Sequence, residues 1–209
     1  MTHSIAGEDV SRETYDDLVA FGDLVKKWTP KINLIAPSTV ADIWGRHIVD
    51  SAQLYRMAPQ DYDHWVDIGS GGGFPGVVMA IYAKERNPGS VFTLIESDQR
   101  KSTFLRTAAR ELAINVKVIA KRTEDVVPQE ADVVSARALA TLSALLPMAA
   151  RHLRPSGLGL FHKGQSSAEE IAKARADWAF DLEQRPSFTD PAARLLSIQR
   201  ISRVGEKRS

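Results

Sequence analysis

The chain of 209 residues contains no cysteine, and this absence excludes several kinds of chemistry. Disulfide bridges and metal sites built from thiolates are impossible. A cysteine nucleophile is excluded as well. Catalysis that adds a thiolate to a pyrimidine ring therefore does not belong to this protein.

The sequence also lacks a long apolar run. Its longest apolar stretch, residues 138–150, is interrupted by Thr141, Ser143 and Pro147, whereas a membrane-spanning helix needs about 18 apolar residues in succession. The first residues are polar and acidic, unlike the basic start of a signal peptide. We therefore expect a cytoplasmic protein with no membrane partner.

A strong charge of one sign is absent too, since the formal net charge is +1. The basic residues are nevertheless unevenly spread. Residues 98–122 contain seven Lys or Arg residues against two acidic residues. Such a cluster can be a solvated helix face or a surface that faces phosphates, and the sequence leaves both interpretations open.

Two helices are predicted before residue 60. The first is predicted over residues 11–28 from an apolar stripe at helical spacing between Leu18 and Trp28, with Ser11 in the N-cap position and Thr29-Pro30 as the stop. The second helix is predicted over residues 40–57. We expect residues 1–60 to form an N-terminal helical extension.

Beyond residue 60, short apolar strands alternate with helices. The predicted strands cover residues 65–68, 91–95, 116–119, 131–135, 157–162, 180–183 and 196–203, and the predicted helices cover residues 74–85, 100–112, 139–153 and 168–178. This alternation predicts a Rossmann-like α/β fold with a mostly parallel sheet and helices on both faces. The last two strands predict an antiparallel hairpin at its edge, and residues 61–209 are expected to form one compact domain.

A glycine-rich turn follows the first of these strands directly, and a helix follows the turn at once. Glycines let the backbone turn tightly and approach a ligand closely, and the helix start presents N–H groups to it. Glu96 lies at the end of the next strand, about 20 residues after the turn. A carboxylate at this position can accept hydrogen bonds from the hydroxyls of a ribose.

Two ligand classes suit this arrangement. Residues 71–76 satisfy the G-x-G-x-x-G pattern of dinucleotide-dependent oxidoreductases. Counted from the strand end, the pattern begins with Asp67 and places glycines at 69, 71 and 73, which favours S-adenosylmethionine. This cofactor has no phosphate to be repelled by Asp67, and its ammonium group would be attracted. We therefore favour a methyltransferase over an oxidoreductase, and over a turn that binds nothing.

The residues after the fourth strand narrow the choice of target atom. Methylation of exocyclic amines commonly uses an Asn/Asp-Pro-Pro-aromatic loop, but residues 135–138 are Ser-Ala-Arg-Ala. Ring nitrogens and hydroxyls remain. Guanine N7 is a good candidate because it has a free lone pair and no proton to lose, so that alignment and exclusion of water suffice. Arg137 could pair with the cofactor carboxylate or an RNA phosphate, or be an ordinary surface arginine.

Four segments together carry a family resemblance. Residues 46–51 (RHIVDS), 67–76 (DIGSGGGFPG), 135–138 (SARA) and 163–164 (KG), in this order, resemble the RsmG (GidB) methyltransferases. The resemblance runs from about residue 11 to residue 202. It implies methyl transfer from S-adenosylmethionine to N7 of a guanine in small-subunit (16S) ribosomal RNA. A non-catalytic RNA-binding protein of ribosome assembly is the remaining alternative.

The resemblance also implies which residues form the site. The cofactor contacts that it implies are Gly69, Phe74, Thr123, Glu124 and Arg137, and the sequence pattern adds Gly71 and Glu96. The residues expected on the substrate side are Arg46, His47 and Lys163, the last as a contact for an RNA phosphate; an ordinary ion pair between Arg46 and Asp50 is the alternative for Arg46. We expect the protein to be a monomer. We expect no metal, because no second histidine or carboxylate has a suitable spacing from His47 to complete a metal site.

Overall fold

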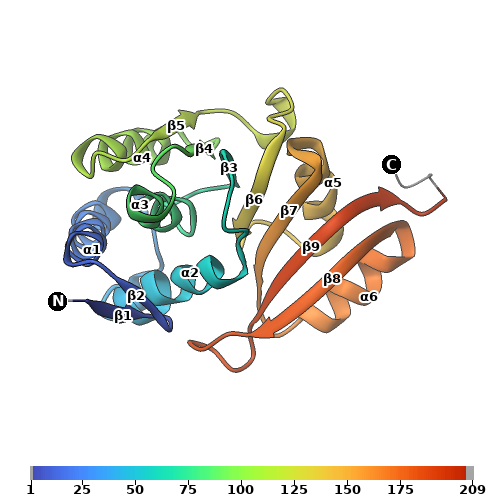
Figure 1. Ribbon diagram of the computed structural model, residues 1–209, viewed down its shortest axis with the longest axis horizontal. Helices are drawn as coiled ribbons and strands as arrows, with labels where there is room; N and C mark the ends of the chain where they lie inside the picture. Colours follow the sequence, from blue (N-terminus) through green and yellow to red (C-terminus); the bar gives the residue numbers. More distant parts are fainter. Residues whose placement is uncertain (1, 206–209) are drawn as a thin grey trace.

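The computed structural model describes residues 2–205 and contains a twisted sheet of seven strands (Figure 1). The strands are β3 (His64–Ile68), β4 (Val91–Ile95), β5 (Val116–Ile119), β6 (Ala131–Arg137), β7 (Leu153–Lys163), β8 (Trp178–Pro186) and β9 (Arg194–Arg203). Their order is β5-β4-β3-β6-β7-β9-β8. The first five are parallel, and β9 is antiparallel to both of its neighbours. The predicted fold and its edge hairpin are confirmed.

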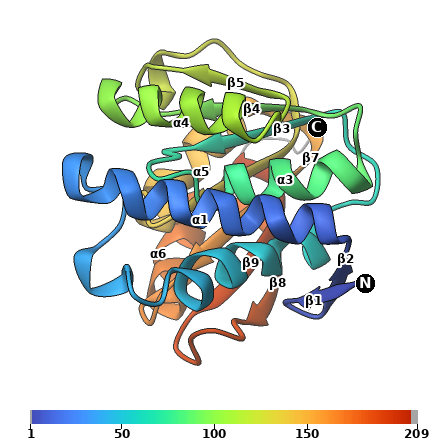
Figure 2. The same ribbon diagram turned by 90° about the vertical axis from the view of Figure 1, so that its left-hand side faces the viewer.

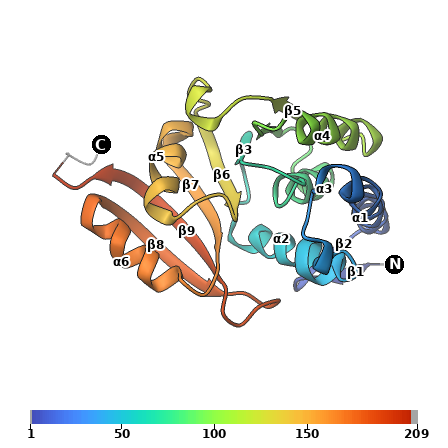
Figure 3. The ribbon, with the colours of Figure 1, turned by 180° about the vertical axis from the view of Figure 1, so that it is seen from behind.

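Helices cover both faces of this sheet. On one face lie α1 (Arg12–Ile32), α3 (Gly76–Arg86) and α4 (Gln99–Glu111), which Figure 2 shows on the side toward the viewer, with α4 above α1. On the other face lie α5 (Leu142–His152) and α6 (Ser167–Asp177), as Figure 3 shows from behind. Side chains alternate along a strand, so Trp65 is buried in the core under α1 and α3, while Val66 is buried in the core under α5.

Helix α1 begins as predicted but ends later. The side-chain oxygen of Ser11 accepts a hydrogen bond from the Thr14 N–H at 3.1 Å, which caps the first turn. The predicted stop at Thr29-Pro30 is wrong, because Pro30 lies inside the last turn. The backbone N–H of Asn33 still donates to the Thr29 carbonyl at 2.9 Å. The helix ends at Asn33, which takes the left-handed conformation that asparagine tolerates.

The second predicted helix is only partly correct. Its region is divided into η1 (Pro37–Thr39), η2 (Trp44–Val49), α2 (Asp50–Ala52) and η3 (Gln53–Met57), of which η2 is a π-helix. A π-helix closes hydrogen bonds over five residues and has a wider turn than an α-helix. The single predicted helix is thus replaced by short segments of different helix types.

A small hairpin at the N-terminus was not predicted. Its strands β1 (His3–Ile5) and β2 (Glu8–Val10) are joined by Ala6 and Gly7, both with positive φ, as a tight two-residue turn requires. Two strands of three residues give almost no periodic signal. Ile5 and Val10 are buried in the core beneath α1, so tertiary packing holds the hairpin.

The strands nearest the site are longer than predicted. β6 continues to Arg137 and β7 begins at Leu153, whereas the sequence predicted strands over residues 131–135 and 157–162. The helix predicted over residues 139–153 begins at Leu142. Arg137 is therefore anchored in the sheet rather than in a loop. The division of the chain at residue 60 stays a prediction.

Candidate functional site

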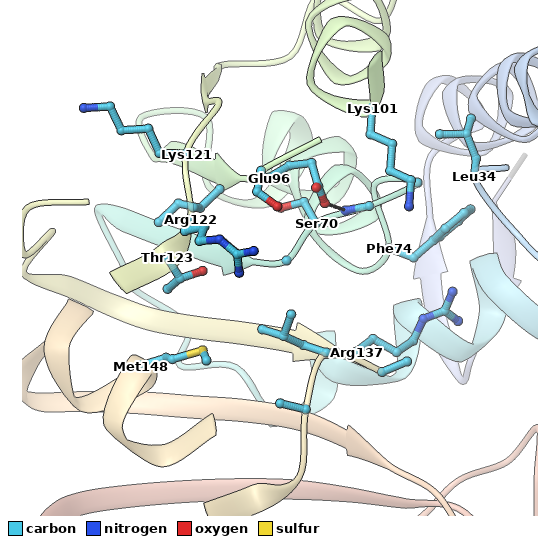
Figure 4. Close-up of a pocket in the computed structure, with 18 of the residues that line it drawn as sticks. Leu34, Ser70, Phe74, Glu96, Lys101, Lys121, Arg122, Thr123, Arg137 and Met148 are labelled. Atoms are coloured by element: carbon cyan, nitrogen blue, oxygen red, sulfur yellow. Dashed lines mark hydrogen bonds between the residues drawn. The ribbon is translucent and has the colours of Figure 1, made fainter. Parts of the chain in front are cut away.

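A cleft of 510 Å³ opens at the carboxyl ends of β3, β4, β5 and β6, where ligands bind in open α/β sheets (Figure 4). All seven residues predicted to contact a cofactor line it: Gly69, Gly71, Phe74, Glu96, Thr123, Glu124 and Arg137. The structure thus brings together residues from four strand ends. Their contact with a cofactor stays a prediction.

The floor of this cleft is bare main chain. Gly69 and Gly71 have φ values of 65° and 52°, in the left-handed region that side chains rarely adopt. A methyl group added to Gly69 would collide with the side chain of Leu139, while one added to Gly71 would meet only the Gly69 carbonyl oxygen at 3.8 Å. Glycine is therefore required at 69 for packing and at 71 chiefly for conformation and for access to the cleft.

Glu96 holds a fixed carboxylate beside this floor. One of its oxygens accepts a hydrogen bond from the Gly71 N–H at 2.8 Å, and the other accepts from the Asp98 N–H at 2.7 Å. The residue is only 8% exposed, yet it lines the cleft. Each carboxylate oxygen can accept a second hydrogen bond. The carboxylate can thus accept hydrogen bonds from the two hydroxyls of a ribose, and the chemistry of the cleft fits an adenosyl ligand.

Asp67, in contrast, does not line the cleft. It is fully buried, and one carboxylate oxygen accepts a hydrogen bond from the Ser135 hydroxyl at 2.6 Å. Burial raises the pKa of Asp67 to about 6. The expectation that this carboxylate faces the ammonium group of a ligand is therefore wrong. Asp67 instead links β3 to β6 beneath the glycine turn.

A second cavity of 340 Å³ adjoins the cleft. It contains the three residues predicted on the substrate side, Arg46, His47 and Lys163. The two cavities share His47, Arg137 and Ala138. A ligand in each cavity would therefore meet the other across these residues.

Arg137 stands at this junction in a dense set of contacts. Its guanidinium donates to a carboxylate oxygen of Asp50 at 3.1 Å and to the Arg46 carbonyl at 3.1 Å. It also donates to Nδ1 of His47 at 2.5 Å and lies 5.1 Å from the centre of the Phe74 ring. Its side chain is 16% exposed. The alternative of an ordinary surface arginine is therefore wrong.

His47 is held in its neutral form. Its Nδ1 accepts from Arg137, so this nitrogen carries no proton. Burial, together with the positive charge of Arg137, lowers the pKa of His47 to about 4. Nε2 lies 2.8 Å from the Thr39 hydroxyl. The imidazole therefore adds no charge to the junction at neutral pH.

The ion pair considered between Arg46 and Asp50 is not formed. Arg46 instead lies 3.9 Å from a carboxylate oxygen of Asp190, and Asp50 pairs with Arg137. Burial by itself would raise the pKa of Asp50, but His162, the Thr189 hydroxyl and Arg137 together hold it below its usual value. Asp50 is therefore an anion at neutral pH.

Lys163 is the last residue of β7, and its ammonium already has protein partners. It lies 2.8 Å from a carboxylate oxygen of Glu170 and donates to the Ala140 carbonyl. Its side chain is 7% exposed. In this arrangement Lys163 connects α6 to the loop after β6. Its role as a contact for an RNA phosphate stays a prediction.

Sequence reasoning missed several members of the site. Lys101, Lys121 and Arg122 line the cleft, and the basic cluster in residues 98–122 was the available signal. The side-chain oxygens of Asp50 and Thr189 lie 2.6 Å apart although the residues are 139 positions apart in the sequence, and no local sequence signal predicts this contact.

Residues 2–205 contain no group of three acidic or histidine side chains that could hold a metal. None of the helices in this range combines the length and apolarity needed to cross a membrane.

Comparison with known proteins decides the family. The family model described as GidB, rRNA small subunit methyltransferase G, matches residues 14–195. The chain belongs to this family. A member from Cereibacter sphaeroides, named ribosomal RNA small subunit methyltransferase G, is 53% identical over 94% of each chain. A relative of the same name from Ruegeria pomeroyi is 50% identical over 94% of this chain and 96% of its own.

Solved structures agree with the fold of this GidB family member. A SAM-dependent methyltransferase from Aquifex aeolicus has a TM-score of 0.61 at 12% identity and covers 85% of this chain and 97% of its own. The predicted family and the prediction of a methyltransferase are thereby confirmed. The alternative of a dinucleotide-dependent oxidoreductase is dropped.

Proposed function

We propose that this GidB family member transfers a methyl group from S-adenosylmethionine to N7 of a guanine in small-subunit ribosomal RNA, as a monomer in the cytoplasm. One observation carries the proposal: two cavities meet at Arg137 and His47. A cofactor in the first and a flipped-out base in the second would be adjacent there. The names of the relatives supply the class of RNA.

The first cavity has the groups that an adenosyl amino acid requires. Glu96 accepts hydrogen bonds from the ribose hydroxyls, and the bare backbone at Gly69 and Gly71 lets the ligand approach closely. Thr123 and Glu124 border the same cleft from the segment after β5, where the adenine would lie. Bound here, S-adenosylmethionine supplies a methyl group on a sulfonium, which a lone pair can accept without loss of a proton.

The second cavity has the size of a ligand pocket and takes the guanine. Its walls need not remove a proton, because N7 carries none. The chain's part is to position the base and to exclude water. Arg137 serves this purpose because Asp50 and His47 fix its guanidinium between the cavities, where it can donate to the neighbouring O6 of the base.

Methyl transfer to small ribosomal subunits that lack the modification tests this function. Labelled S-adenosylmethionine should place one methyl group per subunit, and chain scission specific for N7-methylguanosine should cut the RNA at one guanosine. Methyl groups on an exocyclic amine, or subunits that stay unmodified, would contradict the proposal.

An Arg137→Ala variant separates the enzyme from a non-catalytic binding protein. We expect this variant to bind subunits and to lose methyl transfer about a hundredfold, as misplacement of the reacting groups does. The free energy of unfolding, measured in urea, shows whether the variant remains folded. A wild-type protein that binds subunits but never transfers a methyl group would support the non-catalytic alternative.

A further inference from the structure

The loop between β8 and β9 presents an aromatic side chain that the methyl-transfer chemistry does not use. Phe188 is 65% exposed, while the residues on either side of it face inward: Ser187 is buried, and Thr189 lines the second cavity. Single exposed apolar side chains are common on protein surfaces. The argument therefore rests on how Phe188 is held and where it lies.

The loop around Phe188 is fixed by hydrogen bonds to the N-terminal helical segment. The Phe188 N–H donates to the Gln53 side-chain oxygen at 2.6 Å, and the Gln53 amide group donates to the Ser187 hydroxyl at 3.1 Å. The Thr189 hydroxyl donates to Asp50 at 2.6 Å. These contacts join parts of the chain more than 130 residues apart. They hold the Phe188 backbone in one position beside the cavity.

The loop also closes upon itself. The Ser187 N–H donates to the Ala193 carbonyl at 3.2 Å, and the Ala193 N–H donates to the Asp190 carbonyl at 3.0 Å. The Arg194 guanidinium donates to the carbonyls of Pro191 and Ala193, both at 2.8 Å. A loop tied in this way loses little conformational entropy when a partner binds, so its exposed ring is preorganised for contact.

The position of Phe188 indicates its partner. Thr189 and Asp190, which follow it directly, line the second cavity, and Arg46 beside Asp190 leaves half of its side chain exposed. A base that enters this cavity must be unstacked from its neighbours. Unstacked bases in single-stranded RNA are commonly recognised by stacking on aromatic rings.

We propose that Phe188 is a base-stacking site for RNA: a nucleotide next to the target guanine packs its base on this ring while the guanine occupies the second cavity. This proposal deepens the proposed function and rests on it for the identity of the RNA. It assigns Phe188 to binding of the substrate, not to the chemical step.

Affinity for unmodified small subunits, measured by filter binding, tests the proposal without requiring methyl transfer. Phe188→Ala should raise Kd about tenfold, as loss of one base–aromatic stack does, and should raise KM by the same factor with kcat unchanged. Phe188→Trp should restore both values. Val204→Ala, which trims another apolar side chain that is 58% exposed, is the matched control and should leave Kd unchanged.

Phe188→Leu distinguishes RNA from a protein contact on the ribosomal particle. Leucine keeps the apolar surface but cannot stack, so we expect it to behave like alanine. If leucine restores the affinity, or if alanine leaves Kd unchanged, the stacking site is refuted. Adenosylhomocysteine affinity should be equal in all variants. Absence of methyl transfer by the wild type would refute the proposed function alone, because the Kd comparison would still decide the role of Phe188.

Discussion

The two cavities are built in different ways. The first has a floor of main chain at Gly69 and Gly71, beside which Glu96 is held by the N–H groups of Gly71 and Asp98. The second is made of side chains from η2, β6, β7 and the β8–β9 loop, centred on Asp50 and Arg137. The comparison teaches that the floor of the first cavity follows from a local backbone motif, whereas the second cavity depends on long-range packing.

The largest effect on the first cavity is expected from Gly71→Leu. The new side chain would point into the cleft. Leucine would also have to adopt the left-handed backbone conformation of Gly71, at a cost of about 1–2 kcal/mol in stability. We expect affinity for adenosylhomocysteine to fall about a thousandfold, or about 4 kcal/mol, measured by calorimetry. Gly89→Ala is the control, since no atom lies within 4 Å of its added methyl group. Unchanged affinity in Gly71→Leu would place the cofactor elsewhere.

Asp50→Ala should damage the second cavity instead. It leaves the buried Arg137 guanidinium without its anion and releases Thr189. We expect the free energy of unfolding, measured in urea, to fall by about 3 kcal/mol, and affinity for subunits to fall because the Phe188 loop loosens. Asp50→Asn, which keeps the shape, should lose less. If both variants are as stable as the wild type, the Asp50 contacts do not organise this cavity.

A smaller, pH-dependent effect should appear at His47. Its pKa is lowered from the usual 6.5 to about 4 by burial and by Arg137. A group whose folded-state pKa is depressed contributes stability that is present above pH 6.5 and lost as the pH falls through 4. Relative to His47→Gln, the wild type should lose about 1 kcal/mol of unfolding free energy between pH 7 and pH 4, after discounting for partial exposure. A difference that stays constant with pH would contradict a neutral His47.

The first cavity was largely predictable because the elements that form it are close together in the sequence. Strand, glycine turn and helix follow one another in residues 64–86, and Glu96 ends the next strand. The carboxyl ends of neighbouring parallel strands meet at one edge of a sheet, so the residues there must converge. Asp67 was the exception: the pattern locates its position in the sequence, but only packing shows that its carboxylate points toward Ser135.

The substrate side was less predictable. Arg46, His47 and Lys163 were predicted on the substrate side, but their partners were not predicted. Arg46 pairs with Asp190 from the β8–β9 loop, and Lys163 pairs with Glu170 from α6. Neither effect has a local sequence signal, because each depends on two elements that meet only after folding.

By itself, the sequence determined the order of the strands and helices of the α/β domain, the family and the glycine-rich turn after β3. These follow from periodicity and from motifs of a few residues. Only the tertiary structure decided that Asp50, Arg137 and Thr189 meet, that Lys163 is buried, and that Phe188 stands exposed on a fixed loop. The physical reason is that side-chain hydrogen bonds and ion pairs join whatever the fold brings within reach, regardless of separation along the chain.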